Sequence, residues 1–243
     1  MRSSRSATDD PPVDLLDPGP AGFAHRGFHG PGVPENSLAA FEAALAIGAG
    51  IECDVRLSAD GKAVVFHDSD LRRLCASGLR VEAAPAGLLV AQRLFGTGQR
   101  IPLLADLIDL TAGRVPLLIE LKCHGGNADR LAAAVAADVG ARHAPVGVMS
   151  FEPRAVRWFA RNRADLRRGL VISRRSSSLA RWNAIRACAP HFLAVDRAAL
   201  ASAWVARQRT RRRVYSWTIR TAGERETARV HADALIWEAD GRP

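Results

Sequence analysis

The stretch IECDVRLSADGKAVVFHD at residues 51–68 decides the fold, because it joins two β-type runs through a tight turn. Asp60-Gly61 lies between Gly50–Leu57 and Ala63–His67, and Asp-Gly in this setting is typical of a two-residue hairpin. The two arms of a hairpin are antiparallel. We therefore predict that Ala63–His67 is the returning arm of a hairpin and not a member of a parallel sheet.

Outside this hairpin arm, short β-type runs alternate with longer Ala/Leu/Arg segments of helical period, which is typical of βα units. The eight remaining runs are Gly22–His25, Gly50–Leu57, Val115–Lys122, Val146–Phe151, Gly169–Ser173, Phe192–Asp196, Val214–Ile219 and Ala234–Trp237. Helices are predicted from Leu38, capped by Asn36 or Ser37, and over Asp129–Val139, Pro153–Asn162, Ser178–Ala187 and Ala198–Arg209.

This pattern predicts an α/β protein with one domain, a (β/α)₈ TIM-type barrel. Ala76–Arg100 has scattered glycines and no persistent period, so we expect a short excursion from the barrel there. An open doubly wound sheet is the competing architecture. It is disfavoured because no strand is followed by a G-x-G-x-x-G or Walker-type loop.

The composition is that of a folded globular protein, with 48% hydrophobic and 24% charged residues in 243. No apolar run approaches the ~20 residues of a transmembrane helix, so no integral membrane segment is expected. Met1–Pro20, with four aspartates and four prolines, is expected to be a polar leader, and 21–243 the barrel domain. The four cysteines lack C-x-x-C spacing, which favours a reduced, cytoplasmic compartment and argues against zinc.

The formal charge of +9 does not by itself indicate nucleic acid as a partner. Only Lys62 and Lys122 are lysines, so 32 of the 34 basic residues are arginine, which indicates a coding bias. Arg207–Arg213 is the densest basic run, but no aromatic residue interleaves it, and we interpret it as a solvated helix end. The positive field would still attract a small anionic substrate.

Polar residues gather where the early strands end, which is where a barrel of this type carries its active groups. They are His25, Arg26, Glu52, Asp54, His67, Glu120 and Lys122. Because residues i and i+2 of a strand share a face, Glu52 points with Asp54, and Glu120 points with Lys122. Three carboxylates offer hard oxygen ligands, which suit Mg²⁺ or Ca²⁺. A lone Glu-x-Asp at a strand end more often lies at a solvent-exposed edge of a sheet. Here, however, the polar side chains at four strand ends share the same inward phase, which indicates a site.

The sequence resembles the glycerophosphodiester phosphodiesterase family over nearly the whole chain. The matching segments are AHRG at 24–27, PENSLAAFEAAL at 34–45, IECDVRLSADGKAVVFHDSDL at 51–71, IPLLADLI at 101–108, LLIELK at 117–122, SFEP at 150–153, GLVIS at 169–173 and VYSWTI at 214–219. The resemblance implies a (β/α)₈ barrel with a divalent-metal site. It also implies hydrolysis of glycerophosphodiesters to glycerol 3-phosphate and an alcohol.

The resemblance also implies roles for individual residues. Glu52, Asp54 and Glu120 match the metal ligands, and His25 and His67 match a pair of acid–base histidines. Arg26 and Lys122 match groups that hold the phosphate, while Asn36 is expected to line the same mouth. We take His25 as the base and His67 as the acid. We expect the other histidines to be structural or solvated: His29, His124, His143, His191 and His231.

The chain departs from the family pattern at several places. Arg220 stands where the family usually has Asn, and the closing strand ends Ile236-Trp237-Glu238 in place of Thr-Asp. Arg220 either grips a second anionic group or is an ordinary surface arginine. Trp217 either packs against a glycerol moiety or belongs to the core. Further departures are LRRLCASGLRVEAAP at 71–85, where threonines are expected, and Cys123, where proline is common.

Two other functions stay open at this point. A lysophospholipase D-like activity on the same site needs an apolar channel for an acyl chain, and Ala76–Arg100 is the evident place for one. A catalytically inactive barrel that binds phosphorylated ligands would be marked by a broken ligand set, which the sequence does not have. The oligomeric state is not encoded in any pattern of the sequence.

Overall fold

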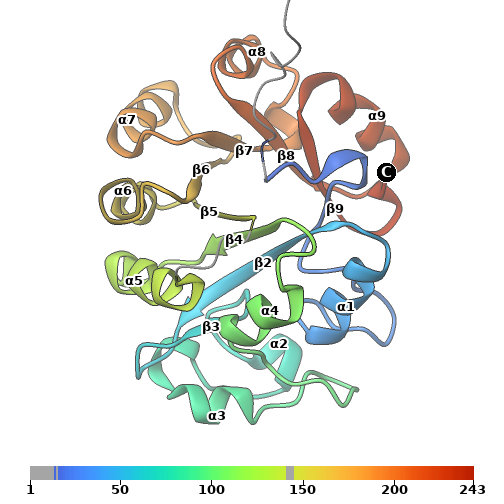
Figure 1. Cartoon of the computed structure of the whole chain (residues 1–243), viewed down its shortest axis with the longest axis vertical. Coiled ribbons are helices and arrows are strands. Elements are labelled where there is room, and N and C mark those ends of the chain that lie inside the picture. Colours follow the sequence, from blue (N-terminus) through green and yellow to red (C-terminus); the bar gives the residue numbers. More distant parts are fainter. Residues whose placement is uncertain (1–13, 15, 141–144) are drawn as a thin grey trace, which may run out of the picture.

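Parallel strands close into a barrel surrounded by helices, as predicted (Figure 1). The computed structural model describes residue 14 and residues 16–140 and 145–243. Among these residues the sheet runs β1-β9-β8-β7-β6-β5-β4-β2-β3, and pairing of β1 with β2 closes it. The strands are β1 Phe23–Ala24, β2 Gly50–Leu57, β3 Ala63–Val65, β4 Leu117–Leu121, β5 Val146–Ser150, β6 Arg167–Ile172, β7 Phe192–Asp196, β8 Arg213–Ile219 and β9 Ala234–Trp237.

The β2–β3 hairpin is confirmed. β3 pairs with β2 in antiparallel fashion, with Val55 opposite Val65 and Leu57 opposite Ala63. Asp60 accepts a hydrogen bond from Ser58 Oγ, and Gly61 adopts a φ of +82°, which glycine tolerates best. The hairpin arm thus leaves eight parallel strands for the barrel among the residues that the structure describes.

Helices alternate with the barrel strands: α1 Leu38–Ala46, α4 Leu104–Thr111, α5 Ala128–Val139, α6 Pro153–Asn162, α7 Ser178–Cys188, α8 Ala203–Arg209 and α9 Ala222–His231. Ser37, not Asn36, caps α1. The single helix predicted over Ala198–Arg209 is wrong, because a 3₁₀ turn covers Arg197–Ala199 and Ser202 then caps α8. We did not predict α4 or α9.

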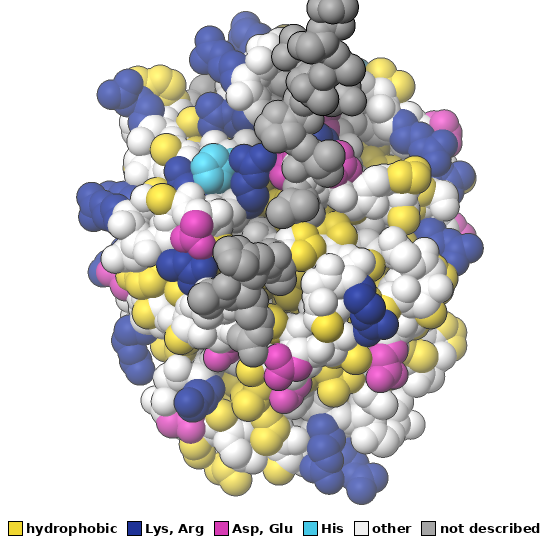
Figure 2. Space-filling model, in the orientation of Figure 1, with side chains coloured by type: hydrophobic (Ala, Val, Ile, Leu, Met, Phe, Trp, Pro, Cys, Tyr) yellow, Lys and Arg dark blue, Asp and Glu magenta, His cyan; other side chains and the backbone are white. Residues whose placement is uncertain are grey.

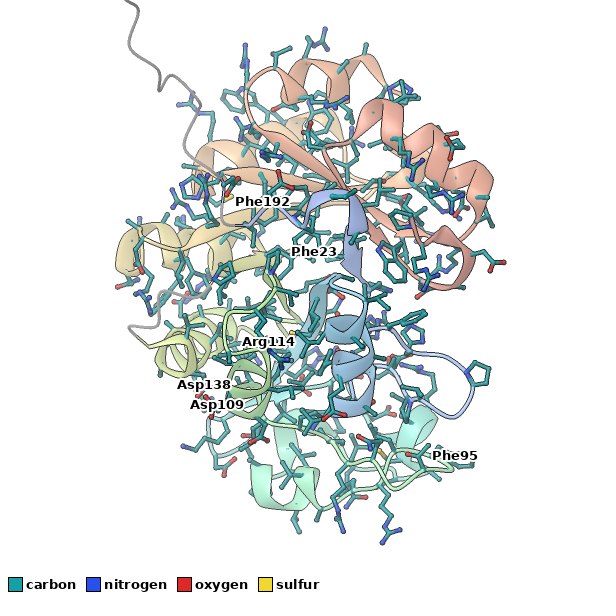
Figure 3. All side chains as sticks on the ribbon, turned by 45° about the vertical axis from the view of Figure 1, so that its right-hand side comes forward. Phe23, Phe95, Asp109, Arg114, Asp138 and Phe192 are labelled. Carbon is teal, nitrogen blue, oxygen red and sulfur yellow. The ribbon has the colours of Figure 1, made fainter. Side chains whose placement is uncertain are left out.

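The excursion between β3 and α4 has a small core of its own. It holds α2 Arg72–Cys75, a 3₁₀ turn at Val81–Ala83 and α3 Ala86–Val90. Its buried apolar side chains pack with those of the hairpin arm: Val64, Phe66, Leu71, Val81, Ala84, Ala86, Leu89, Leu94 and Ile101. Phe95, which is 69% exposed, lies at the outer edge of this segment, far from the barrel interior (Figure 3). The apolar residues of the excursion therefore stabilise the excursion itself.

The interior of the barrel carries a second apolar cluster. Phe23 and Phe192 point into it from β1 and β7 (Figure 3), together with Tyr215 of β8. Leu16 also belongs to this cluster and is 2% exposed, although it lies in the stretch expected to be a polar leader. A Cβ at position 147 would lie 2.5 Å from Leu16 Cδ2, so Gly147 makes room for this side chain. The rest of the expected leader, 1–13 and 15, lies outside the described residues.

On the face seen in Figure 2, Lys and Arg side chains are dispersed among acidic and apolar ones. Within the basic run, Arg209 pairs with Asp233 at 2.8 Å and Arg213 with Asp17 at 3.1 Å, whereas Arg207 is exposed. The helices of the described residues are all too short or too polar to cross a bilayer.

Replacing Leu16 by alanine is expected to lower the free energy of unfolding by about 2–4 kcal/mol, because it opens a cavity in the barrel interior. Leu179→Ala is the matched control, since Leu179 is 68% exposed and its loss should cost no more than about 0.5 kcal/mol. Urea denaturation of both variants measures the difference. Equal stability of the two variants would show that Leu16 adds nothing to the core.

Candidate active site

Three carboxylates meet at the carboxyl end of the barrel. Glu52 and Asp54 come from β2 and Glu120 from the neighbouring β4, where Glu120 lies opposite Asp54 in the register. Each of the three residues offers an oxygen atom, and these atoms lie within 4.8 Å of one another. All three side chains are buried, so the strand alternation seen in the sequence has brought them together.

Two cations lie against this triad. Lys122 Nζ is 3.1 Å from Asp54 Oδ1 and also bonds Glu120, while Arg26 Nε is 3.1 Å from Asp54 Oδ2. Burial raises the pKa of Asp54, but Lys122 and Arg26 outweigh it and hold that pKa well below its usual range. Asp54 therefore stays ionised.

Glu52 is the carboxylate that these cations leave least satisfied. Burial raises its pKa well above the usual range, and the charges of Asp54 and Glu120 raise it further. Its Oε2 accepts a hydrogen bond from the Arg26 backbone N–H at 3.0 Å, while its buried Oε1 has no hydrogen-bond partner among the residues that the structure describes. An unpaired oxygen next to two further carboxylates fits a hard divalent cation.

Asn36 does not line the mouth as expected; it is buried beside Asp54. Asn36 Nδ2 donates to Asp54 Oδ2 at 2.9 Å, and the Asp54 N–H donates to Asn36 Oδ1 at 3.2 Å. Its φ of +54° is a left-handed conformation that asparagine tolerates better than most residues. Asn36 thus contacts the Asp54 carboxylate and backbone, which sequence spacing did not reveal.

Each of the two predicted histidines is hydrogen-bonded through Nδ1 to a carboxylate. His25 Nδ1 lies 2.9 Å from Glu238 Oε2, and His67 Nδ1 lies 2.7 Å from Asp68 Oδ1. Burial lowers the pKa of both rings below the ordinary histidine value. Asp68 and Glu238 were not among the predicted site residues.

The strand phase could have revealed Glu238. Ala234 and Ile236 point into the barrel interior, so Glu238, two residues further on, has the same phase at the mouth. The same rule places Asp196 after Ala194 on β7, and Asp196 also lines the cavity. The identity of the partner, His25, could not be read this way, since it is 213 residues away.

Arginines hold the carboxylates that contact the histidines. Arg73 Nε donates to Asp68 at 2.6 Å, and the same arginine also bonds Glu35. Arg220 Nε donates to Glu238 Oε1. Its guanidinium is thus bonded to a carboxylate of the site itself, and Arg220 also lines the cavity. Whether it grips a second anionic group or is an ordinary surface arginine stays a prediction.

A cavity of about 650 Å³ opens beside these groups. One side is lined by residues of the early strands and the loops that follow them: His25, Arg26, His67, Glu120 and Lys122. The facing side is lined by Phe151, Arg174, Asp196, Trp217 and Arg220, among others. Trp217 thus faces the cavity, with its Nε1 donating to Ala194 O and its ring packed edge-on against Phe151.

The remaining histidines that the structure describes lie outside this cavity. His29 Nε2 is 3.5 Å from Glu238 Oε2, the same oxygen that contacts His25. His124 contacts Arg80, and His191 accepts a hydrogen bond from the Arg168 N–H. His231 lies at the end of α9, and His143 is outside the described residues.

The profile of the glycerophosphoryl diester phosphodiesterase family matches residues 25–241, which contain every residue of this site. The chain belongs to that family. It is 40% identical over 107 residues to the glycerophosphodiester phosphodiesterase of Bacillus altitudinis, covering 41% of this chain and 43% of that protein. It is 43% identical over 90 residues to a probable glycerophosphodiester phosphodiesterase 2 of Mycobacterium tuberculosis, covering 35% and 33%. The aligned part thus spans less than half of either relative.

Solved structures match over almost the whole chain. A phosphodiesterase of Oleispira antarctica, in complex with the product sn-glycerol 3-phosphate, has a TM-score of 0.80 at 21% identity and covers 90% of this chain and 92% of that one. A glycerophosphodiester phosphodiesterase of Thermotoga maritima has a TM-score of 0.73 at 25% identity and covers 88% and 92%. The predicted family and barrel fold are confirmed.

Divalent cations are expected to stabilise this protein through the carboxylate triad. At about 100 times its Kd, a bound ion adds ~2.7 kcal/mol, which raises Tm by roughly 5–10 °C in a protein of this size. Glu52→Gln should abolish this rise without lowering the Tm of the metal-free protein, because it removes one of three crowded negative charges. Thermal scans with chelator, Mg²⁺ or Ca²⁺ measure both effects. A variant that keeps the full rise would exclude Glu52 as a ligand.

Proposed function

We propose that this protein is a metal-dependent hydrolase that converts glycerophosphodiesters to glycerol 3-phosphate and an alcohol. The observation that carries the proposal is the buried triad of Glu52, Asp54 and Glu120 beside two histidines at one cavity. The relative in Bacillus altitudinis is a glycerophosphodiester phosphodiesterase, and the Oleispira antarctica structure holds glycerol 3-phosphate, so both support this substrate class.

Glu52, Asp54 and Glu120 would hold Mg²⁺ or Ca²⁺, since both ions prefer oxygen ligands. When bound, the ion supplies positive charge that polarises the phosphoryl oxygens. Arg26 and Lys122, which line the cavity beside the triad, are the protein's own cations for the phosphodiester. Their present bonds to Asp54 keep both side chains pointed at that position.

His25 and His67 carry the proton transfers in this proposal. The alkoxide leaving group needs a proton donor, and the attacking oxygen needs a base. Since each ring donates Nδ1–H to a carboxylate, Nε2 is the atom left to exchange a proton with a ligand in the cavity. We assign His25 as the base and His67 as the acid.

The structure gives less support to the two other functions. All of 76–100 is described, and none of these residues lines the cavity, so the apolar channel that a lysophospholipid needs is not built from them. An inactive barrel is expected to have lost part of its ligand set, whereas all three carboxylates are in place. A small-molecule phosphodiester is therefore the proposed partner.

The compartment is a further part of the proposal. Cys53, Cys75, Cys123 and Cys188 are all unpaired, and Cys53 and Cys188 are buried. Free thiols of this kind suit a reducing environment. We propose that the protein works in the cytoplasm.

Purified protein is expected to release glycerol 3-phosphate from glycerophosphocholine in the presence of Mg²⁺ or Ca²⁺ and to stop when a chelator is added. A coupled glycerol 3-phosphate assay measures the rate. Turnover of lysophosphatidylcholine with none of glycerophosphocholine would favour the lysophospholipase D-like function. No turnover of either, with metal bound, would favour the inactive barrel.

Replacement of either histidine by alanine should slow glycerophosphocholine hydrolysis by about 10²–10⁴-fold. The p-nitrophenyl ester of glycerol 3-phosphate separates the two roles, because its leaving group needs no proton. His67→Ala should recover most of its loss on this substrate, whereas His25→Ala should not. The reverse pattern would exchange the roles of acid and base.

His231→Ala is the matched control for this experiment, because His231 lies at the end of α9 outside the cavity. Its rates on both esters should equal those of the unmodified protein. Two histidine variants that keep full activity on both esters would contradict acid–base catalysis by this pair.

A further inference from the structure

His25 is held at the junction of three neighbouring strands. It follows β1, and its backbone N–H donates to Trp237 O of β9 at 2.8 Å. Glu238 follows β9 directly, and its own N–H donates to Ile219 O at the end of β8. Arg220, the residue directly after β8, bonds the Glu238 carboxylate. Backbone pairing therefore sets the order His25, Glu238, Arg220 around the mouth.

We propose that Glu238, anchored by Arg220, is a positioning residue that fixes the tautomer and orientation of His25 during phosphodiester hydrolysis. The inference rests on the proposed function and assigns to it two residues at positions where this chain departs from the family pattern. Glu238 acts through His25 and need not touch the substrate.

The hydrogen bond between the two side chains defines the tautomer. An ionised carboxylate only accepts hydrogen bonds, so His25 Nδ1 must carry the proton that bridges the 2.9 Å to Glu238 Oε2. The neutral ring then has its lone pair on Nε2, which suits a base at the cavity. The side chains are only 10% and 17% exposed, and low local polarity strengthens such a bond.

Glu238 is held in its ionised form. Burial raises its pKa, but hydrogen bonds from His25 and His29, together with the charges of His25 and Arg220, outweigh burial and hold that pKa well below the usual range. After His25 takes a proton, the same carboxylate stabilises the imidazolium. One group thus orients the base and favours its charged state.

Arg220 limits how Glu238 can rotate. Arg220 bonds Oε1 of Glu238, while His25 bonds Oε2, so each carboxylate oxygen is bonded to a different partner. Arg220 is itself placed by its backbone N–H, which donates to Glu224 Oε2 at 2.8 Å. Because its side chain is 51% exposed, we expect the anchor to contribute less than the carboxylate.

Glu238→Gln keeps the size of the side chain but lets its amide donate to Nδ1, which favours the wrong tautomer. We expect kcat to fall by about 10²-fold with KM changed less than about 3-fold, within the range found for orienting carboxylates. Glu238→Asp should recover at least about 10-fold of that loss. Glu226→Gln is the matched control, since Glu226 is 65% exposed in a surface ion pair and its loss should leave kcat unchanged.

Arg220→Gln is expected to lower kcat by about 3- to 10-fold, and the double variant with Glu238→Gln should be no slower than Glu238→Gln alone. Additive losses would separate Arg220 from Glu238 and overturn this part of the proposal. A Glu238→Gln effect confined to KM would make Glu238 a substrate contact, which would also overturn it.

The ¹⁵N shifts of the imidazole rings give a readout that needs no substrate. The His25 signals, assigned by their loss in His25→Gln, should report Nδ1–H in the unmodified protein and a shift toward Nε2–H in Glu238→Gln. An unchanged tautomer would overturn the proposal. If no phosphodiester were hydrolysed, the proposed function would fail, while this measurement would still decide whether Glu238 positions His25.

Discussion

The burial of Glu52, Asp54 and Glu120 next to one another is the constraint that governs the mouth of this barrel. Like charges removed from water repel strongly and favour protonation, so such a cluster persists only with nearby positive charge. Lys122 and Arg26 supply part of it, through contacts that centre on Asp54. Within the described part of the chain, Glu52 Oε1 remains without a hydrogen-bond partner. The buried carboxylates therefore form a position that suits a further cation.

Residues in the loops around the triad adopt unfavourable backbone conformations that bring hydrogen-bond donors to the carboxylates. Arg26 and Asn36 both have positive φ, which costs roughly 1 kcal/mol or more at each non-glycine residue. In return, the Arg26 N–H reaches Glu52 and the Asn36 amide reaches Asp54. Gly27 continues the turn, where a Cβ would lie 2.8 Å from Ala40. The residues with strained backbone conformations are thus the ones that donate hydrogen bonds to the carboxylate triad.

The two ends of the barrel interior differ in chemical character. Toward the amino ends of the strands, Leu16, Phe23 and Phe192 fill the interior with apolar volume. Toward the carboxyl ends, the same inward phase carries His25 and Glu238. Because the apolar side chains of the interior lie toward one end, the other end can bear buried charge and polar groups that would weaken an ordinary core. This separation also explains why residues at the mouth that differ from the family pattern, such as Arg220 and Glu238, leave the barrel fold intact.

The sequence by itself determined the class of fold and which strands carry the three carboxylates and Lys122. Asp60-Gly61 settled the number of parallel strands, and the period of two placed Glu52 with Asp54 and Glu120 with Lys122. These are local rules, and chain position is enough to apply them. Only the tertiary structure decided that Leu16 enters the core and that Glu238 holds His25. Both depend on closure of the barrel, which brings β9 beside β1. A periodic pattern states which face a side chain occupies but not which distant residue it meets across that face.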